Sequence, residues 1–452
     1  HTGAELMYDY SEKYFVKLDL GYSGSDQYAR SSRYVSTPSV AAAWMISNEA
    51  FLKNNQVLTL LKIRGSYGKT ANDQSGLNRF AYMDNVRLQG GGPIGYLQYL
   101  VVENTKGDPR ISAEVSTKTN GGIDIGLFNA ITINADIFNE KVDNMIVPAT
   151  GAIPAYQGIP LGNYPSLNQG KFENKGFEVA IDYTKEFNKN WGASIGGNLS
   201  YSKNTILSIN EAQKASDYTY LKQQEGYSYG QAFGYLVDYS NGNGMFNTQA
   251  ELDNNTLAYS FGTPRLGDLI YKDLNGDGKI NDRDVAPIGN GALPKYIYGI
   301  TGRIRFKSLE LNMLFQGVNQ FTTIYSGTGV YETSYDGVFG ALHSQSWTAE
   351  RYAAGEEILY PALSTRQSVN HQASDFFEYD RSFIRLKNLE LSYTFPGSVA
   401  HAIAAQNIRL LLSGQNLITW DKMKSKDFGP EGSGYLGFPV YRVYNIGLSV
   451  TF

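Results

Sequence analysis

The sequence predicts an all-β fold, namely a transmembrane antiparallel β-barrel with long extracellular loops. Three observations predict it. Apolar and polar residues alternate with a period of two from end to end of the 452 residues, many apolar faces begin or end in an aromatic residue, and short turns coexist with long irregular connections. Roughly 13 or 14 strands fit the pattern.

The alternation is clear in individual segments. In YFVKLDLGY (14–22) every even-numbered residue is aromatic or aliphatic, whereas Lys17, Asp19 and Gly21 share the opposite face. Such alternation is typical of a strand with one apolar and one polar face. The same pattern occurs in LKIRGSYG (61–68), ITINADIFNE (131–140), FEVAIDY (177–183), WGASIGGNLSY (191–201), YIYGITGRIRF (296–306), LELNMLF (309–315), LELSYTF (389–395) and YNIGLSVTF (444–452).

Aromatic residues at the strand ends favour a membrane barrel over a soluble sandwich. A sandwich turns its apolar faces inward and keeps a wet face rich in Lys, Glu and Thr, whereas a barrel turns apolar faces to lipid between two aromatic girdles. A separation of eight to ten residues corresponds to about 25–35 Å at about 3.3 Å per residue, which matches a hydrocarbon layer. The pairs are Tyr14/Tyr22, Trp191/Tyr201, Tyr296/Phe306 and Tyr444/Phe452.

The connections between the expected strands fall into two classes. Segments 186–191 and 305–310 are tight turns, as expected on the periplasmic side of a barrel. So many loops above about 20 residues would be unusual in a compact soluble domain, but they are typical of the extracellular side of a barrel. The long connections are about 70–115, 140–175, 202–229, 240–294, 318–381 and 417–441.

Composition excludes several classes of protein. The length allows two or three soluble domains or one large β-architecture, and aromatic residues reach 13% while charged residues are only 18%. The longest apolar run, about SVAAAWMI (39–46), is too short for a transmembrane helix, so membrane crossing would require β-strands. A net charge of -4 argues against nucleic acid as a partner, and the lack of cysteine excludes disulfides and Cys-ligated metals.

The segment DLNGDGKINDRD (273–284) predicts a calcium-binding loop. Its oxygen-bearing residues fall at positions 1, 3, 5, 9 and 12, Gly278 at position 6 allows the sharp turn, and Ile280 occupies the buried position 8. Aspartate at position 12 makes the pattern similar to the dockerin type, DxNxDGxINxxD. We expect a structural Ca²⁺ that orders a long extracellular loop, 240–294. The expected ligands are Asp273, Asn275, Asp277, the backbone carbonyl of Lys279, Asn281 and Asp284.

Aromatic loop residues are the candidate substrate contacts. Aromatic faces can stack on the CH groups of sugars while neighbouring polar groups bind the hydroxyls, but tyrosine also serves simply to pack loops. The candidates are Tyr96, Tyr99, Tyr156, Tyr164, Tyr325, Tyr331, Tyr335 and Trp347.

No arrangement typical of catalysis is present, and we expect the protein not to be an enzyme. The four histidines are scattered without HxxxH or HExxH spacing, and cysteine is absent. GGGPIG (90–95) lacks the strand and helix context of a phosphate-binding loop. Carboxylates on the polar strand faces are expected to pair with basic neighbours: Asp136, Asp182 and Glu310 with Lys62, Arg64, Arg303 or Arg305.

An ordered series of segments resembles the SusC/RagA-like TonB-dependent transporters of Bacteroidetes. The resemblance covers nearly the whole chain, 1–452, and implies the C-terminal part of a barrel of about 22 strands with a plugged lumen, of which this chain supplies about 14. The segments are YDYSEKYFVKLDLGYSGSDQY, STPSVAAAWMISNEAFL, LKIRGSYGKTAND, KGFEVAIDY, DLNGDGKINDRD, SDFFEYDRSFIRLKNLELSYTFP, IRLLLSGQNLITW and the terminal GLSVTF with Phe452.

The same resemblance implies a function and partners. It implies TonB-energised uptake of a bulky nutrient, a glycan more often than a peptide, across the bacterial outer membrane, with a SusD-like lipoprotein as a lid. The signal peptide, TonB box and plug of the family match nothing here. Because an open sheet edge is not tolerated in the lipid bilayer, we expect the chain to be joined by the remaining N-terminal barrel and plug, and its N-terminus at His1 to be internal to a longer protein.

Two alternatives stay open at this point. One is a secreted, soluble, calcium-dependent carbohydrate-binding or glycan-degrading β-protein, for which the dockerin-like loop would be the mark. The other is a passive porin or adhesin, which the sequence upstream of His1 would decide.

Overall fold

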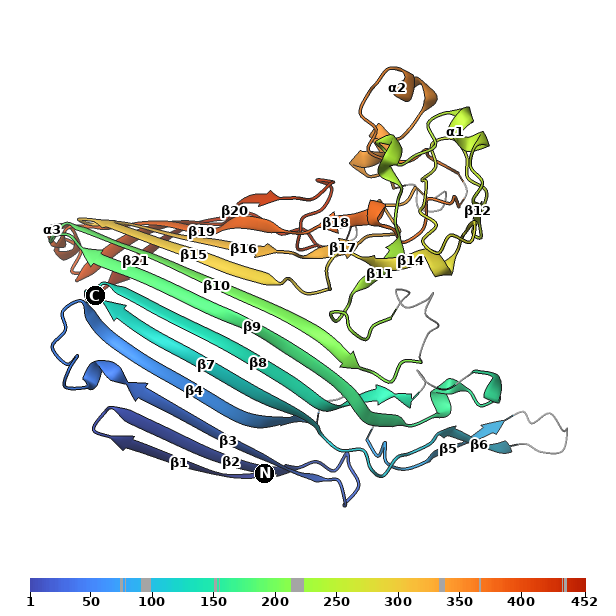
Figure 1. The fold of residues 1–452 in the computed structure, drawn as a ribbon. Helices are drawn as coiled ribbons and strands as arrows, with labels where there is room; N and C mark the ends of the chain where they lie inside the picture. The colour runs from blue at the N-terminus through green and yellow to red at the C-terminus, as the bar shows by residue number, and fades with distance from the viewer. Residues whose placement is uncertain are drawn as a thin grey trace. The chain divides into compact units, whose positions relative to one another are not determined.

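A large antiparallel sheet dominates the computed structural model (Figure 1), which describes residues 1–452 except 74–75, 78, 91–98, 150–152, 154, 213–222, 333–337, 366, 433 and 435–436. In the described part the sheet has 13 strands, which confirms the predicted fold class, and follows the order β1-β2-β3-β4-β7-β8-β9-β10-β15-β16-β19-β20-β21. The bounds are β1 Thr2–Tyr10, β2 Tyr14–Gly24, β3 Tyr34–Met45, β4 Leu58–Asn72, β7 Glu114–Leu127, β8 Ile131–Pro148, β9 Ser166–Glu186, β10 Trp191–Ser208, β15 Tyr296–Phe306, β16 Leu309–Asn319, β19 Phe383–Thr394, β20 Asn407–Asp421 and β21 Val443–Thr451.

The two faces of the strands differ as the alternation predicts. In β2 the apolar residues from Tyr14 to Tyr22 are all exposed, with Leu20 at 53% of its surface, while Lys17 and Asp19 on the other face are partly covered. A folded protein that leaves whole strand faces of Leu, Val and Tyr uncovered needs an apolar surrounding. The apolar faces therefore suit contact with lipid.

Aromatic pairs mark both ends of the apolar face across β2 and β3. The rings of Tyr14 and Trp44 stack with centroids 6.3 Å apart, and at the other end of the strands Tyr22 stacks on Tyr34 at 5.4 Å. Tyrosine and tryptophan combine an apolar ring with a polar tip, which suits the boundary between hydrocarbon and water. Two rows one strand length apart agree with the girdles that the sequence predicted.

The chain forms two compact units, and the first comprises His1–Tyr183, Asn198–Gln213 and Gln224–Ser228. At one end of its strands the turns are short: Phe128 and Asn129 between β7 and β8 both have positive φ, 55° and 52°, as the two central residues of a type I′ turn require. Longer loops at the other end carry the hairpin of β5 (Asn85–Gly90) and β6 (Tyr99–Thr105) (Figure 1). Its 3-10 helices are η1 (Ile46–Asn48), η3 (Ala155–Gln157) and η4 (Leu161–Asn163).

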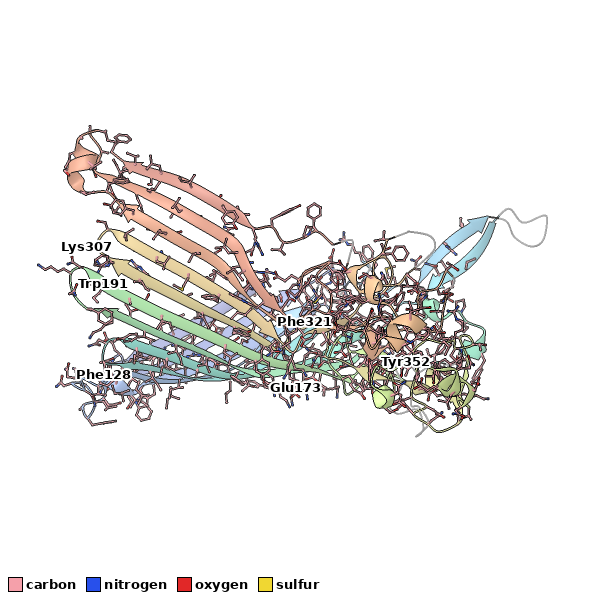
Figure 2. All side chains as sticks on the ribbon, turned by 90° about the horizontal axis from the view of Figure 1, so that it is seen from above. Phe128, Glu173, Trp191, Lys307, Phe321 and Tyr352 are labelled. Atoms are coloured by element: carbon pink, nitrogen blue, oxygen red, sulfur yellow. The ribbon has the colours of Figure 1, made fainter. Side chains whose placement is uncertain are left out.

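The second unit comprises Thr184–Gly197, Lys214–Gln223 and Tyr229–Phe452. Its short turns also gather at one end, where the rings of Trp191 and Phe306 lie 4.3 Å apart and Lys307 N donates to Asn190 O at 2.7 Å. Figure 2 shows Trp191 and Lys307 at this end and Phe321 and Tyr352 toward the other. The helix α3 (Gly397–His401) belongs to the short-turn end (Figure 1).

At the opposite end of the second unit three long connections fold together. We call the described residues of 229–294, 320–382 and 422–432 the loop globule. Among the described residues, no helix is long and apolar enough to span a membrane. The elements of the loop globule are β11 (Ala232–Tyr235), η6 (Tyr239–Asn241), α1 (Gln249–Asp253), β12 (Ala258–Tyr259), β13 (Lys279–Ile280), η7 (Asp282–Asp284), β14 (Val285–Ile288), β17 (Thr322–Ile324), η8 (Ala341–Gln345), α2 (Ala349–Ala353), η9 (Asp375–Phe377) and β18 (Glu378–Asp380).

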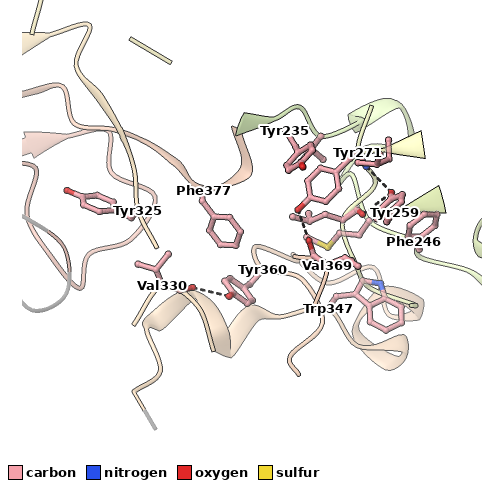
Figure 3. Close-up of a cluster of buried hydrophobic side chains, with 14 of the residues drawn as sticks. Tyr235, Phe246, Tyr259, Tyr271, Tyr325, Val330, Trp347, Tyr360, Val369 and Phe377 are labelled. Carbon is pink, nitrogen blue, oxygen red and sulfur yellow. Dashed lines mark hydrogen bonds between the residues drawn. The ribbon is translucent and has the colours of Figure 1, made fainter. Parts of the chain in front are cut away.

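The loop globule has an aromatic-rich core of its own (Figure 3). Buried tyrosine hydroxyls lie beside backbone carbonyls: Tyr271 donates to Val369 O at 3.1 Å, and the Tyr360 hydroxyl lies 2.9 Å from Val330 O. The first contact joins residues 98 apart in the sequence and the second joins residues 30 apart, so the long loops are packed like a small soluble domain. The buried members are Tyr235, Val237, Met245, Phe246, Tyr259, Leu269, Tyr271, Ile280, Val285, Tyr325, Val330, Trp347, Tyr360, Val369, Phe377, Tyr379 and Met423.

A buried polar network lies beside this core. The Glu332 carboxylate is 3% exposed, accepts from the Tyr360 hydroxyl at 2.6 Å and from Ser364 N at 3.0 Å, and lies 3.1 Å from His371 Nε2 at a distance but not an angle typical of a hydrogen bond. Burial raises the pKa of Glu332, but the contacts with His371 and Tyr360 outweigh it and hold the pKa below its usual 4.5. The ionised carboxylate therefore stabilises the loop globule.

We predict that Glu332 makes this stability dependent on pH. Because its folded-state pKa is lowered, its contribution is fully present above about pH 4.5 and is lost as the pH falls through the lowered pKa. The destabilisation caused by Glu332→Gln should accordingly be larger at pH 7 than at pH 3.5. Urea midpoints from the fluorescence of Trp347, with the other three tryptophans replaced by Phe, measure it.

The control is Glu350→Gln, since Glu350 is exposed on α2. That variant should follow the wild type at both pH values. An equal shift in the Glu332→Gln midpoint at pH 3.5 and pH 7 would show that the carboxylate charge contributes nothing.

Candidate functional site

The predicted calcium loop, residues 273–284, forms a tight turn followed by a short parallel bridge. Gly276 and Gly278 have φ values of 74° and 80°, and glycine adopts this left-handed conformation without strain. The chain then pairs β13 with β12, Ala258 opposite Lys279. Two sharp bends thus bring the oxygen-bearing side chains of the segment close to its own backbone.

Side-chain oxygens of the first half of the loop accept from backbone N–H groups. The two oxygens of Asp273 accept from Gly276 N at 2.7 Å and from Gly278 N at 2.8 Å. Asn275 Oδ1 accepts from Asp277 N at 3.0 Å, and Asp277 Oδ1 accepts from Lys279 N at 2.9 Å. Burial raises the pKa of Asp273, but the donors from Gly278 and Gly276 outweigh it, so its pKa is lowered and the carboxylate is ionised.

The second half anchors the loop in the core of the loop globule. Ile280 and Asp284 are both 0% exposed, and the Asp284 carboxylate accepts from Leu274 N at 2.8 Å and from Asn281 N at 2.9 Å. Burial raises the pKa of Asp284. The Asp284 carboxylate at position 12 therefore closes the loop by binding the backbone of Leu274 at position 2. It lies in a low-dielectric site, where a positively charged partner would stabilise its ionised form.

The donor set of the loop suits a hard cation. Carboxylate, amide and backbone oxygens are the ligands that Ca²⁺ takes, commonly six to eight of them. In the part of the chain that the structure describes, no three His, Cys, Asp or Glu side chains form a group arranged to hold a metal. The predicted ligands of this loop combine Asn side-chain and backbone carbonyl oxygens with the carboxylates of Asp273, Asp277 and Asp284. This chemistry fits Ca²⁺, and its binding stays a prediction.

Of the aromatic candidates, Trp347 lies in the core and Tyr331, which is partly buried, packs against it. Trp347 is 8% exposed and its indole N–H donates to Asn247 Oδ1 at 3.1 Å. Tyr331 stacks on His371 with centroids 4.9 Å apart and meets Phe377 edge-on at 4.8 Å. These rings stabilise the loop globule and offer little surface to a ligand.

The other candidates differ in exposure. Tyr156 is 90% exposed, whereas Tyr325 is 6% exposed in the core, and the Tyr164 hydroxyl donates to Gln157 Oε1 at 3.0 Å. Tyr99 begins β6, and nothing is described of its side chain; Tyr96 and Tyr335 lie outside the described residues.

Of the carboxylates predicted to pair on the polar strand faces, Asp136 and Glu310 form ion pairs. Arg64 of β4 donates through Nη1 and Nη2 to the two oxygens of Asp136 on β8 at 2.5 and 2.6 Å, and its Nε donates to Asp124 Oδ2 at 3.3 Å. Gly122 on the intervening strand makes room, since a Cβ there would lie 2.6 Å from the guanidinium carbon. In the second unit Arg303 donates to Glu310 at 2.8 Å.

Asp124 is a member of this arrangement that the sequence reasoning missed. It accepts from Asn134 Nδ2 at 2.9 Å as well as from Arg64. The signal was available, because Asp124 lies between Ile123 and Ile125 in a strand of alternating character. Its pairing with Arg64 follows from strand register, with Lys62 opposite Asp124 and Arg64 opposite Gly122.

Comparisons of sequence identify the family. The family model "TonB dependent receptor-like, beta-barrel" matches residues 4–417. TonB-dependent receptor P3 of Formosa agariphila is 26% identical over 98% of this chain and 44% of its own length. TonB-dependent receptor SusC of Bacteroides thetaiotaomicron is 25% identical over 86% of this chain and 37% of its own length. The chain spans less than half the length of these curated relatives.

Comparison of structure agrees at the level of the fold. The chain superposes on a structure of the RagAB peptide transporter with a TM-score of 0.76 and 19% identity, covering 100% of this chain and 47% of that one. A family model that extends over most of the strands is the decisive finding. The chain therefore belongs to the TonB-dependent receptor β-barrel family, and its sheet is part of an outer-membrane barrel.

Proposed function

We propose that the protein containing this chain imports a bulky nutrient across the outer membrane with energy delivered through TonB. The observation that carries the proposal is the family match over residues 4–417. It also argues against a secreted soluble binding protein and against a passive porin. The proposed cargo is an oligosaccharide, with a peptide as the alternative, and the chain contributes no covalent chemistry.

The arrangement of charges supports a water-filled passage beside the polar strand faces. Groups such as Arg64, Asp124 and Asp136 form hydrogen-bonded ion pairs on one face while the opposite face is apolar. Barrels that carry polar cargo have this division. Paired charges leave no strong net field, which suits a neutral, hydroxyl-rich cargo better than a highly charged one.

The proposed partners follow from the same family membership. They are a SusD-like lipoprotein lid over the extracellular mouth, TonB, and the remaining N-terminal barrel and plug. Support for the last comes from the sheet, in which β1 and β21 are the two outermost strands. A sheet in lipid cannot keep open edges, so further strands must pair with both.

Energised import is tested in cells of the source bacterium. Deletion of the gene should abolish uptake of one fluorescent oligosaccharide from a panel, and the intact gene should restore it. A protonophore that collapses the proton gradient should block uptake as completely as deletion does. Uptake that continues at the same rate with the protonophore would indicate passive diffusion, and selective loss of peptide uptake would reassign the cargo.

We further propose that Asp273, Asn275, Asp277, Lys279 O, Asn281 and Asp284 bind one structural Ca²⁺. The support is the ligand pattern, the tight turn through Gly276 and Gly278, and the anchoring of Asp284 in the core. A bound ion would tie the two ends of the loop together and neutralise the buried carboxylate. It would thereby stabilise the loop globule at its β12–β13 side.

Calcium binding predicts a measurable gain in local stability. At a free concentration one hundred times the dissociation constant, linkage gives about 2.7 kcal/mol. Chelation should make residues 240–294 sensitive to protease, and calcium should restore protection. Asp273→Asn with Asp277→Asn should abolish the calcium effect, because two ionic ligands become neutral.

Asp253→Asn is the matched control, since Asp253 ends the neighbouring helix α1 outside the ligand pattern. It should keep the full response to calcium. Elemental analysis should find about one calcium per wild-type chain and none in the double variant. Equal protease sensitivity with and without calcium, together with no bound metal, would show that residues 273–284 form a turn that does not bind Ca²⁺.

A further inference from the structure

A pocket on the loop globule has walls of aromatic rings. Its volume is about 430 Å³, within the size range of small-molecule sites. It lies between η6, η9, β18 and the segments around 342, 358 and 424, so all three connections of the loop globule contribute. Its lining includes Tyr239, Leu342, Glu357, Phe376, Tyr379 and Lys424.

The aromatic walls are held rigidly. Phe376 meets Phe377 edge-on with centroids 5.1 Å apart, and both Phe377 and Tyr379 are core residues less than 5% exposed. Tyr239 is different, because 44% of its side chain is exposed. Its ring is supported by the chain at Gly244, where a Cβ would lie 3.0 Å from the ring. A fixed, partly exposed ring is available to a ligand at low entropic cost.

Polar groups converge on the same pocket. Lys424 Nζ donates to Phe376 O at 2.8 Å and lies 5.7 and 5.8 Å from the centroids of Phe376 and Tyr379. One of its three N–H bonds makes that hydrogen bond. Glu357 supplies an exposed carboxylate to the lining. The pocket thus combines ring faces with one strong donor and one strong acceptor.

The surrounding charges decide which ligand suits the pocket. Asp375 and Glu378 lie close enough to Lys424 to interact with it, and burial raises the pKa of both carboxyls and lowers the pKa of Lys424. An anionic ligand would meet more carboxylates than cations here. A purely aliphatic ligand would leave Lys424 and Glu357 desolvated without compensation. A neutral ring bearing several hydroxyls satisfies both polar groups and packs against the aromatic walls.

We propose that this pocket is a subsite for one neutral sugar unit of the imported glycan. Tyr239 and Phe376 contact the apolar face of the sugar, Lys424 donates to a hydroxyl oxygen, and Glu357 accepts from a hydroxyl. The inference rests on the proposed import function and names the cargo class for a site that lies outside the calcium loop and the strand faces.

Binding is measured with the intact detergent-purified protein by calorimetry. The probes are four neutral hexasaccharides, maltohexaose, cellohexaose, laminarihexaose and mannohexaose, with hexaalanine as a peptide probe. Tyr239→Ala should weaken binding of the recognised hexasaccharide about tenfold. Lys424→Met, which keeps the apolar stem but removes the donor, should also weaken it. Tyr352→Ala is the matched control, since Tyr352 is 42% exposed on α2 outside the pocket.

The outcomes separate the pocket from the import function. Binding by the wild type that neither Tyr239→Ala nor Lys424→Met changes would overturn the pocket while leaving glycan import intact. A wild type that binds no hexasaccharide, or only hexaalanine, would overturn the sugar assignment, while protonophore-sensitive uptake in cells would still support an importer. Unchanged heat-modifiable mobility of the variants on gels establishes that their barrels are folded.

Discussion

Backbone hydrogen bonding in an apolar surrounding is the constraint on which the rest of this structure depends. A strand that faces lipid cannot give its N–H and C=O groups to water, so each must pair with a neighbouring strand. The strand pairings are accordingly long, as in β15 with β16, where Tyr296 to Phe306 pair residue by residue with Asn319 to Leu309. This requirement is compatible with short connections at one end and with most of the irregular structure at the other.

The same constraint sorts the side chains. Once the backbone is satisfied within the sheet, one face can be entirely apolar and the other can carry charges, provided that those charges are paired. Arg64 shows how closely the pairing depends on the sheet: it spans β7 to reach Asp136 because Gly122 leaves space and because the register brings β4, β7 and β8 into line. An aligned sheet is therefore a condition for the proposed polar passage.

The long-loop end of the second unit obeys the rules of a soluble domain. Its three connections bury a common core. Tyrosine hydroxyls form hydrogen bonds with backbone carbonyls inside it, as Tyr271 does with Val369. Hydrogen bonds such as that from Asn370 Nδ2 to Asp268 Oδ1 at 2.9 Å link segments that are distant in the sequence. A rigid globule can hold the predicted calcium loop and the proposed sugar pocket in fixed positions. The membrane strands provide the support, and the globule provides the specific surface.

The sequence by itself determined the fold class, the approximate strands, the two classes of connection and the calcium pattern. Each of these depends on local spacing, since a period of two and the loop positions 1 to 12 can be read within a dozen residues. Only the tertiary structure decided which aromatic residues are buried and which acids share a cation. The sequence predicted Trp347 as a ligand contact. In the structure its indole N–H donates instead to Asn247, one hundred residues earlier in the chain. Asp124 accepts a hydrogen bond from Arg64 because the register of β4 with β7 brings the two side chains together. Contacts of this kind depend on how distant segments pack, and packing leaves no periodic signal in the chain.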